Sequence, residues 1–506
     1  MYFSELLRGT GVALAGGDPA IGGVDYDSRR IEPGWLFVAM QGESTNGNRY
    51  IDTALENGAA AVVTDSKHER HRRGVPWAVV PHGRRALAVI SANFYGRPAE
   101  QLHIVGITGT NGKTTTSFLC DYILRHCGKK TALVGTIEYR VGGVVLPAPH
   151  TTPEALELNQ IFAQALDAGV SHAVMEVSSH ALEQERVWGV PYRVGVFTNL
   201  TRDHLDYHKD MQRYFEAKSA LFAGCGAAPP RFAVINADDE YGRNLAQNRA
   251  RATQQVIRYG IQDGDFRAAN VDLRPDGSSF ELVTPENSVK ISTALIGAVN
   301  VYNILAAAGA TAALGCTLEQ IAAAISGFQQ VPGRFERVDC GQPFTVVVDY
   351  AHTDDALRNL TKIARDFVHR GLGIGRVITV FGCGGDRDRT KRPLMGEAAG
   401  QGSDFVVLTS DNPRSEDPAR IIDDALAGLA KTRTRHTVDI NRRHAIRTAL
   451  IEAMPGDMVL IAGKGHEKVQ ITREGTFPFD DVQVVRKELE QLGYMACAGE
   501  AERQKR

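Results

Sequence analysis

The chain has 506 residues, 43% of them hydrophobic and 23% charged, which is ordinary for a globular protein of several domains. A formal net charge of −2 gives no global basic field, so nucleic acid is not expected as a partner, and no run approaches the roughly 18 apolar residues of a membrane span. The seven scattered cysteines form no C-x-x-C pair, which favours reduced thiols and a cytoplasmic location over a disulfide framework or a zinc site.

Residues 1–98 are predicted to form a small first domain. Strand-like segments lie at residues 24–29, 35–40, 59–64 and 77–80, and a helix is expected at 51–57. This alternation of strand and helix predicts an α/β domain. Ser28 fits a plain turn, and the polar loop at residues 42–48 has a composition suited to binding but no diagnostic spacing.

The central unit, residues 99–334, is organised around I-V-G-I-T-G-T-N-G-K-T-T-T at residues 104–116. The apolar, β-branched start predicts a buried strand, the glycines a tight loop, and Lys113 and Thr114 the start of a helix. Such a unit holds a triphosphate, because loop N–H groups point at the phosphates, the lysine supplies charge and the threonine hydroxyl can ligate Mg²⁺. Ile107 breaks the strict Walker spacing, so the loop is a variant. The flanking strand and helix argue against a chance glycine turn.

Further strands of a mainly parallel sheet are predicted to end in polar residues, at the edge where ligands bind. Residues 172–177 contain Glu176, which is placed for Mg²⁺ or for a structural hydrogen-bond network. The segment T-N-L-T-R-D-H-L-D-Y-H contains His204, which suits magnesium beside phosphates; zinc is the alternative, although no cysteine accompanies it. Lys218, alone on a predicted helix, would by itself be taken for a solvated residue.

Two asparagines and an arginine complete the central unit. Asn300 and Asn303 stand near the start of an alanine-rich helix, where they either bind a purine edge or cap the helix, and the cap is the default. Arg334 lies in the linker V-P-G-R-F-E and is available to a phosphate.

Residues 335–506 are predicted to form a second doubly wound domain. Strands at 346–349, 377–382, 405–409 and 458–462 each deliver polar residues at their carboxyl ends. Arg387, Arg414 and Glu467 suit a ligand that carries both a carboxylate and an ammonium group, because the arginine fork binds carboxylates bidentately. A network of interdomain salt bridges is the alternative.

Six motifs occur in the order T-G-T-N-G-K-T-T, M-E-V-S-S-H, T-N-L-T-R-D-H-L-D-Y-H, P-G-R-F-E, D-Y-A-H-T and G-K-G-H-E. Together they resemble the Mur ligase family, ATP-dependent amide-bond-forming enzymes of bacterial peptidoglycan assembly, and within it the branch that adds the third amino acid. The resemblance spans about residues 25–481. It implies an α/β fold of three domains: a uridine-nucleotide-binding domain (1–98), a P-loop ATPase domain (99–334) and a Rossmann-like amino-acid-binding domain (335–506).

The resemblance also implies residue roles. ATP would contact Gly109, Thr110, Asn111, Gly112, Lys113, Thr114, Thr115, Asn300, Asn303, Arg334, Asp349, Tyr350 and His352. The UDP-linked muramoyl dipeptide would contact Tyr26, Ser28, Glu43, Ser44, Thr45, His150, Thr151, Thr152, Ser178, Gln184 and Arg186. The amino acid would contact Arg387, Asp411, Asn412, Pro413, Arg414, Gly463 and Glu467. Magnesium would be held by Thr114, Glu176, His204 and Lys218, the last as a CO₂-derived carbamate (N6-carboxylysine), and catalytic roles would fall to Lys113, Lys218, Glu176, His204 and Arg334.

The motif D-N-P-R at residues 411–414 resembles the version that accompanies meso-2,6-diaminopimelate. That amino acid carries a distal carboxylate for Arg414, which L-lysine lacks, and an arginine left unpaired opposes lysine binding. The expected reaction is ATP-dependent addition of meso-diaminopimelate to the D-glutamate γ-carboxylate of UDP-MurNAc-L-Ala-D-Glu, by a monomer.

Three alternatives stay open: the same ligase with L-lysine, a folate polyglutamate or cyanophycin-type ligase, and an ATP-hydrolysing P-loop switch. His150 and Asp354 depart from the usual family pattern of asparagine and proline.

Overall fold

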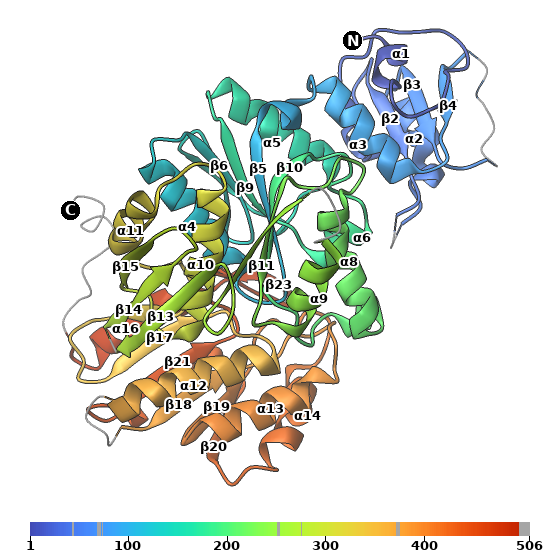
Figure 1. The fold of residues 1–506 in the computed structure, drawn as a ribbon. Coiled ribbons are helices and arrows are strands. Elements are labelled where there is room, and N and C mark those ends of the chain that lie inside the picture. The colour runs from blue at the N-terminus through green and yellow to red at the C-terminus, as the bar shows by residue number, and fades with distance from the viewer. Residues whose placement is uncertain are drawn as a thin grey trace.

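Three α/β units follow one another along the chain, each built on its own sheet (Figure 1). The computed structural model describes residues 1–42, 45–67, 72, 74–249, 254–274, 276–370 and 375–494. The first unit projects from one end of the central unit, and the C-terminal unit packs against its opposite side. The predicted fold class is confirmed, and the exact domain boundaries stay a prediction.

The first unit is a parallel sheet of order β1-β2-β3-β4. Its strands are short and buried because their side chains are small and apolar on both faces. The strands are β1 (Val24–Asp25), β2 (Leu36–Ala39), β3 (Ala61–Thr64) and β4 (Trp77–Val79). The helices are α1 (Phe3–Leu6), α2 (Ile51–Glu56) and α3 (Gly83–Phe94).

The central sheet has eleven strands in the order β15-β14-β13-β12-β11-β10-β5-β9-β6-β7-β8. Strands from β13 to β6 in this order pair in parallel, and antiparallel pairs extend the sheet at both ends. The strands are β5 (His103–Thr108), β6 (Thr131–Val134), β7 (Glu138–Val141), β8 (Val144–Pro147), β9 (His172–Glu176), β10 (Tyr192–Phe197), β11 (Phe232–Asn236), β12 (Gln255–Gly260), β13 (Phe266–Arg274), β14 (Gly277–Val283) and β15 (Ser288–Thr293).

Helices cover both faces of the central sheet (Figure 1). One apolar cluster joins the sheet to α4, α10 and α11, and a second joins its other face to α5, α8 and α9. The helices are α4 (Lys113–His126), α5 (Ala155–Asp167), α6 (Ser179–Glu183), α7 (Leu205–His208), α8 (Met211–Ala223), α9 (Glu240–Arg249), α10 (Ala298–Ala312) and α11 (Leu318–Gly327). Because β5, β9 and β10 run parallel, the polar groups that follow them collect at one edge of the sheet.

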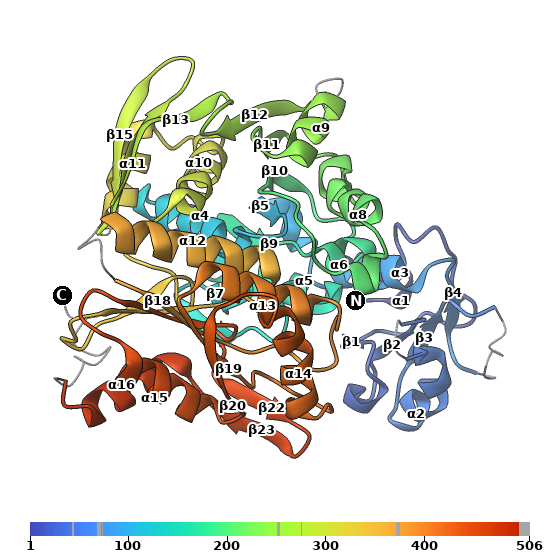
Figure 2. The same cartoon turned by 90° about the horizontal axis from the view of Figure 1, so that it is seen from below.

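The C-terminal unit is a six-stranded sheet of order β16-β17-β21-β18-β19-β20, parallel except for β16. The strands are β16 (Glu336–Val338), β17 (Thr345–Asp349), β18 (Val377–Phe381), β19 (Phe405–Thr409), β20 (Arg435–Asp439) and β21 (Met458–Ala462), with a hairpin of β22 (Val469–Thr472) and β23 (Gly475–Pro478). The helices are α12 (Asp354–Arg370), α13 (Lys391–Gly402), α14 (Pro418–Leu429), α15 (Arg442–Glu452) and α16 (Asp481–Gln491). Figure 2 shows α12 between α10 and the C-terminal sheet.

A buried ion pair joins α15 to α16. Arg442 donates from Nη2 to Asp481 Oδ2 at 2.7 Å, and both side chains are 0% exposed. Arg442→Met should lower the free energy of unfolding by about 3–5 kcal/mol, because Asp481 would keep a buried charge without its partner. Urea denaturation of the full chain measures this. Lys431→Met, which removes an exposed cation 3.6 Å from Glu397, should lower the free energy of unfolding by no more than about 1 kcal/mol. Equal losses of stability in the two variants would contradict the argument.

The expectation of reduced thiols holds at five cysteines of the described chain. Cys120, Cys127, Cys225, Cys316 and Cys383 are free. In the part of the chain that the structure describes, no helix is both long and apolar enough to cross a membrane.

Candidate active site

The phosphate loop joins β5 to α4, as predicted. Gly109 and Gly112 have φ of +148° and +87°, and a Cβ on either would lie 1.8 Å from Thr198 Oγ1 or 2.4 Å from Asn303 Oδ1. Only glycine fits at these close approaches. Lys113 curls back over the loop, and its Nζ donates to the carbonyl oxygens of Gly109 at 3.0 Å and Thr110 at 2.9 Å. Its charge therefore lies beside the loop that would cradle an anion.

Glu176, at the end of β9, is fully buried and holds a polar cluster behind the loop. Its Oε2 accepts from Thr114 Oγ1 at 3.0 Å and from Thr136 Oγ1 at 2.9 Å. Arg334 donates from Nη2 to Thr114 Oγ1 at 3.1 Å, and its guanidinium lies 4.6 Å from the Tyr350 ring centre. Arg334 Nε has no hydrogen-bond partner among the described residues. A cation with an unused donor thus faces the phosphate loop from the linker between the two larger units.

Lys218, which the sequence alone would have placed in solvent, is 1% exposed on α8. Its Nζ donates to Gly109 O at 2.8 Å, the same oxygen that Lys113 contacts, and lies 4.5 Å from the Tyr214 ring centre. Burial, with a further contribution from the charge of Lys113, holds the pKa of Lys218 well below its ordinary value. This shift favours the neutral amine form of the side chain, which lies at the floor of the loop.

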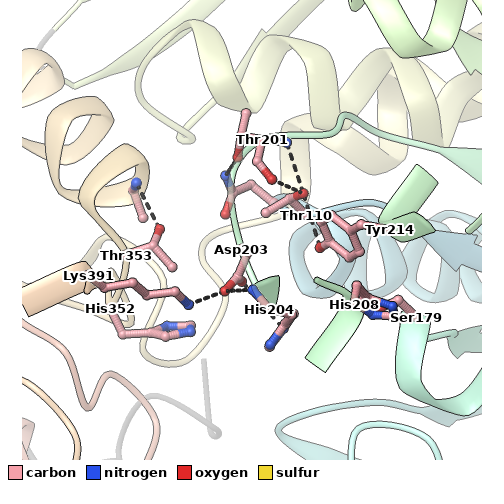
Figure 3. Close-up of polar contacts among 12 residues, drawn as sticks. Thr110, Ser179, Thr201, Asp203, His204, His208, Tyr214, His352, Thr353 and Lys391 are labelled. Atoms are coloured by element: carbon pink, nitrogen blue, oxygen red, sulfur yellow. Dashed lines mark hydrogen bonds and ion pairs between the residues drawn. The ribbon is translucent and has the colours of Figure 1, made fainter. Parts of the chain in front are cut away.

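His204 lies beside this lysine in a cluster of aromatic rings. Its ring centre is 4.8 Å from that of His180 and 6.2 Å from that of Tyr214. Burial lowers the pKa of His204 to about 3, so its ring is neutral at neutral pH and keeps a nitrogen lone pair for a ligand. Figure 3 shows His204 between Asp203 and the ring of Tyr214.

A contact between units that sequence reasoning missed lies next to His204. Asp203 is 5% exposed and forms an ion pair with Lys391 at the start of α13 (Figure 3). Burial alone would raise the pKa of Asp203, but the charge of the Lys391 ammonium group and the hydrogen bond that it donates hold the pKa below its usual range. Asp355 of α12 accepts hydrogen bonds from Asn111 Nδ2 at 2.9 Å and from Thr201 Oγ1 at 3.1 Å. These contacts bring the C-terminal unit onto the phosphate loop, and no spacing in the sequence signals them.

A cavity of about 360 Å³ opens beside the phosphate loop, between α10 and the start of the C-terminal unit. Its lining contains predicted nucleotide contacts, namely Asn111, Gly112, Thr115, Asn300, Asn303, Arg334, Asp349, Tyr350 and His352. The default expectation that the two asparagines cap α10 is wrong, because Gly297 is the N-cap. Asn300 donates to Ile296 O at 2.9 Å, and Asn303 donates to Asn300 Oδ1 at 3.1 Å.

The predicted dipeptide contacts of the central unit lie together. Thr152 Oγ1 donates to Glu176 O at 2.9 Å and accepts from Ser178 N at 3.1 Å, while Arg186 donates to Gln184 Oε1 at 3.0 Å and to Thr152 O at 3.3 Å. Thr151 Oγ1 lies 3.1 Å from Thr136 Oγ1, and His150 is exposed beside it.

The predicted nucleotide-side contacts lie on the first unit. Tyr26 donates to Glu157 Oε1 of the central unit at 2.9 Å, Ser28 is buried and Thr45 is exposed. Glu43 and Ser44 lie outside the described residues.

A second cavity, of about 500 Å³, is lined by both larger units. The central unit contributes His180, His204, Asp206 and Tyr207. The C-terminal unit contributes the predicted amino-acid contacts Arg387, Asp411, Asn412, Arg414, Gly463 and Glu467. Pro413 does not line the cavity, and its carbonyl oxygen accepts from Glu416 N at 3.0 Å.

The cations and carboxylates of this cavity come from different loops. Arg414 donates from Nη1 to Gly385 O at 2.8 Å, and burial together with the like charge of Arg387 lowers its pKa. In the described structure both guanidinium groups donate to backbone carbonyl oxygens and not to carboxylates, so this pair suits an anion. Asp411 and Glu467 suit an ammonium group.

The residues present fit magnesium. Thr114 and Glu176 offer a hydroxyl and a carboxylate 3.0 Å apart, and His204 offers a neutral ring nitrogen. Among the described residues no group of three or more His, Cys, Asp or Glu side chains could hold a metal. A site with few protein ligands suits Mg²⁺, because this ion keeps several bound waters and also takes phosphate oxygens as ligands.

Fold and site together define a nucleotide-binding ligase class, with a P-loop beside a pocket for a zwitterion on a separate domain. Family models match three segments: the Mur ligase family catalytic domain at residues 20–95, the Mur ligase middle domain at 107–311 and the Mur ligase glutamate ligase domain at 333–465. The chain belongs to the Mur ligase family.

Two relatives carry the name UDP-N-acetylmuramoyl-L-alanyl-D-glutamate--2,6-diaminopimelate ligase. The one from Solibacter usitatus (strain Ellin6076) is 52% identical, covering 93% of this chain and 94% of its own. The one from Geobacillus thermodenitrificans (strain NG80-2) is 46% identical, covering 93% and 95%.

Solved structures with a similar fold include one of the same name and one of a different ligase. A structure of the same name is 34% identical, with a TM-score of 0.66, covering 94% of this chain and 96% of its own. A folylpolyglutamate synthase from Mycobacterium tuberculosis, 20% identical with a TM-score of 0.62, covers 76% of this chain and 93% of its own, and shares the fold.

Proposed function

We propose that this protein is the ligase that adds meso-2,6-diaminopimelate to the D-glutamate γ-carboxylate of UDP-MurNAc-L-Ala-D-Glu, with ATP as the energy source, in cytoplasmic peptidoglycan precursor synthesis. It acts as a monomer. The names of its relatives support this reaction. The structural observation that supports it is the cavity that the two larger units share. That cavity holds Arg387 and Arg414 for the carboxylates of the acceptor and Asp411 and Glu467 for one of its ammonium groups, and it opens toward His204 near the phosphate loop.

The first step is phosphoryl transfer from ATP to the γ-carboxylate, which gives an acyl phosphate and ADP. The chain's part is positioning and charge neutralisation. Lys113 lies beside the loop that would hold the β- and γ-phosphates, and Arg334 reaches the same place from the linker with a free Nε–H. Mg²⁺, held by Thr114, Glu176, His204 and carbamylated Lys218, would neutralise phosphate charge. Thr151, Thr152, Ser178, Gln184 and Arg186 would hold the dipeptide.

In the second step an amine of meso-diaminopimelate attacks the acyl carbon, and the tetrahedral intermediate collapses to the amide and phosphate. The attacking amine must be neutral, so its proton leaves before or during attack. The Asp203–Lys391 pair and the Asp355 contacts hold the C-terminal pocket against the phosphate loop, which excludes water from the acyl phosphate.

The decisive test supplies UDP-MurNAc-L-Ala-D-Glu and ATP with Mg²⁺, compares meso-diaminopimelate with L-lysine as acceptor, and follows phosphate release and product mass. We expect amide product with diaminopimelate and at least about a hundredfold lower kcat/KM with lysine, because lysine leaves an arginine unpaired. Turnover with lysine alone would keep the ligase and remove the role of Arg414. Phosphate release without amide would favour an ATP-hydrolysing switch, and glutamate addition to a folate would favour the folylpolyglutamate relatives.

A further inference from the structure

A buried lysine that no predicted role uses lies beneath the amino-acid pocket. Lys464 follows β21 in the motif G-K-G-H-E, and its side chain is 0% exposed. Its Nζ donates to Asn412 Oδ1 at 3.0 Å and to Glu467 Oε2 at 3.2 Å, and lies 3.7 Å from Asp411 Oδ1. Lys464 does not itself line the cavity, but all three of these partners do.

The hydrogen bonds around Lys464 fix the partners relative to one another. Asn412 Nδ2 donates to Glu467 Oε2 at 2.7 Å, the oxygen that Lys464 also contacts. Asn412 Oδ1 accepts from Lys464 and from Ile471 N at 2.9 Å. The amide orientation of Asn412 is therefore set from below the pocket, and both of these hydrogen bonds to Glu467 use Oε2 and leave Oε1 for the acceptor.

The balance of charge around Lys464 also favours binding of an ammonium group at this side of the pocket. Asp411 and Glu467 bring two negative charges to this side of the pocket, and Lys464 leaves a net charge of −1. One acceptor ammonium group balances that charge, whereas two uncompensated carboxylates would repel each other and attract the nearby Arg387 and Arg414 away from the acceptor's carboxylates.

We propose that Lys464 is a positioning residue for the amino-acid acceptor: it neutralises one of the two pocket carboxylates and orients Asn412 and Glu467 to receive the acceptor's ammonium group. This inference rests on the proposed function. Its effect is confined to the amino acid, because the polar partners of Lys464 among the described residues are Asn412, Glu467 and Asp411, which belong neither to the phosphate loop nor to the predicted dipeptide contacts.

The test measures the KM of each substrate in the full chain for Lys464→Met, with Lys468→Met as the matched control. Lys468 is four residues further on, 62% exposed, and pairs with Asp480 at 2.7 Å. In Lys464→Met the KM for meso-diaminopimelate should rise about tenfold or more, as expected for lost hydrogen bonds to charged groups, with the KM values for ATP and the UDP-dipeptide within about twofold of wild type. In Lys468→Met all three should stay within about twofold.

Lys464→Gln replaces Lys464→Met if the latter does not fold, since it keeps a donor but removes the charge. An unchanged KM for diaminopimelate, or an equal rise in all three KM values, would overturn the proposal, since a purely structural lysine moves the three together. If wild-type protein forms no amide with diaminopimelate, the proposed function has failed. In that case the shift in Tm that diaminopimelate produces is measured for Lys464→Met and for wild type. Equal shifts in the two proteins would overturn the role of Lys464.

Discussion

Lys218→Ala should lower kcat by at least about a thousandfold, the scale of losing a preorganised charged group at a reacting phosphate. The buried Lys218 amine beside Gly109, whose pKa burial lowers, can add to CO₂ with loss of a proton, which gives a carbamate anion that lies near Lys113 and can ligate Mg²⁺. Alanine removes the nitrogen to which the CO₂ is joined. Steady-state phosphate release with all three substrates measures the loss.

Chemical rescue separates the carbamate from a simple packing role. A short carboxylic acid supplied to Lys218→Ala should restore part of the activity, because it places a carboxylate in the vacated space. Lys487→Ala, an exposed lysine on helix α16, should retain wild-type activity with or without the acid. Full activity of Lys218→Ala without rescue would remove the carbamate from the mechanism, and loss without any rescue would leave Lys218 with a structural role.

Arg414→Ala should lower kcat/KM for meso-diaminopimelate by about a hundredfold to a thousandfold, because the distal carboxylate would lose a bidentate, partly buried partner. The loss should fall mainly on KM for the amino acid. The preference over L-lysine should shrink by a similar factor, since the unpaired cation that opposes lysine would be gone. Competing diaminopimelate and lysine in one assay, with product masses counted, measures the ratio directly.

Arg420→Ala is the matched control for this prediction, because Arg420 is an exposed arginine of the adjacent helix α14. It should leave both acceptors unaffected. A loss of diaminopimelate turnover in Arg414→Ala with an unchanged preference over lysine would mean that Arg414 supports the pocket without reading the distal carboxylate. The preference would then have to come from Arg387 or from the shape of the cavity.

Strands and glycine loops with contiguous signals could be predicted from the sequence. The phosphate loop, the strand before Glu176 and the parallel strands of both larger units were found because an apolar run and its polar exit are adjacent in the chain. Hairpins at residues 138–147 and 469–478 were not predicted, since their alternation is weak and strand pairing there depends on neighbours.

Site membership depended on burial and on contacts between distant segments. The residues next to Lys218 and Lys464 in the sequence give no signal of burial, and nothing local distinguishes these two lysines from the exposed Lys487. The tertiary structure buries both, because the helix that carries Lys218 and the strand end that carries Lys464 pack against segments that are distant in the chain. The resemblance of the motifs supplied the role of Lys218, whereas Lys464 received no role from it.

By itself the sequence determined an α/β protein of three units, with a phosphate loop in the second, because each of these rests on residues close together in the chain. Only the tertiary structure decided that Asp203 meets Lys391, that Arg334 reaches Thr114, and that Lys464 lies beneath Asp411 and Glu467. The physical reason is that a charge is paired or buried by whatever packs against it, and these partners are 188, 220 and, for Asp411, 53 positions apart in the chain.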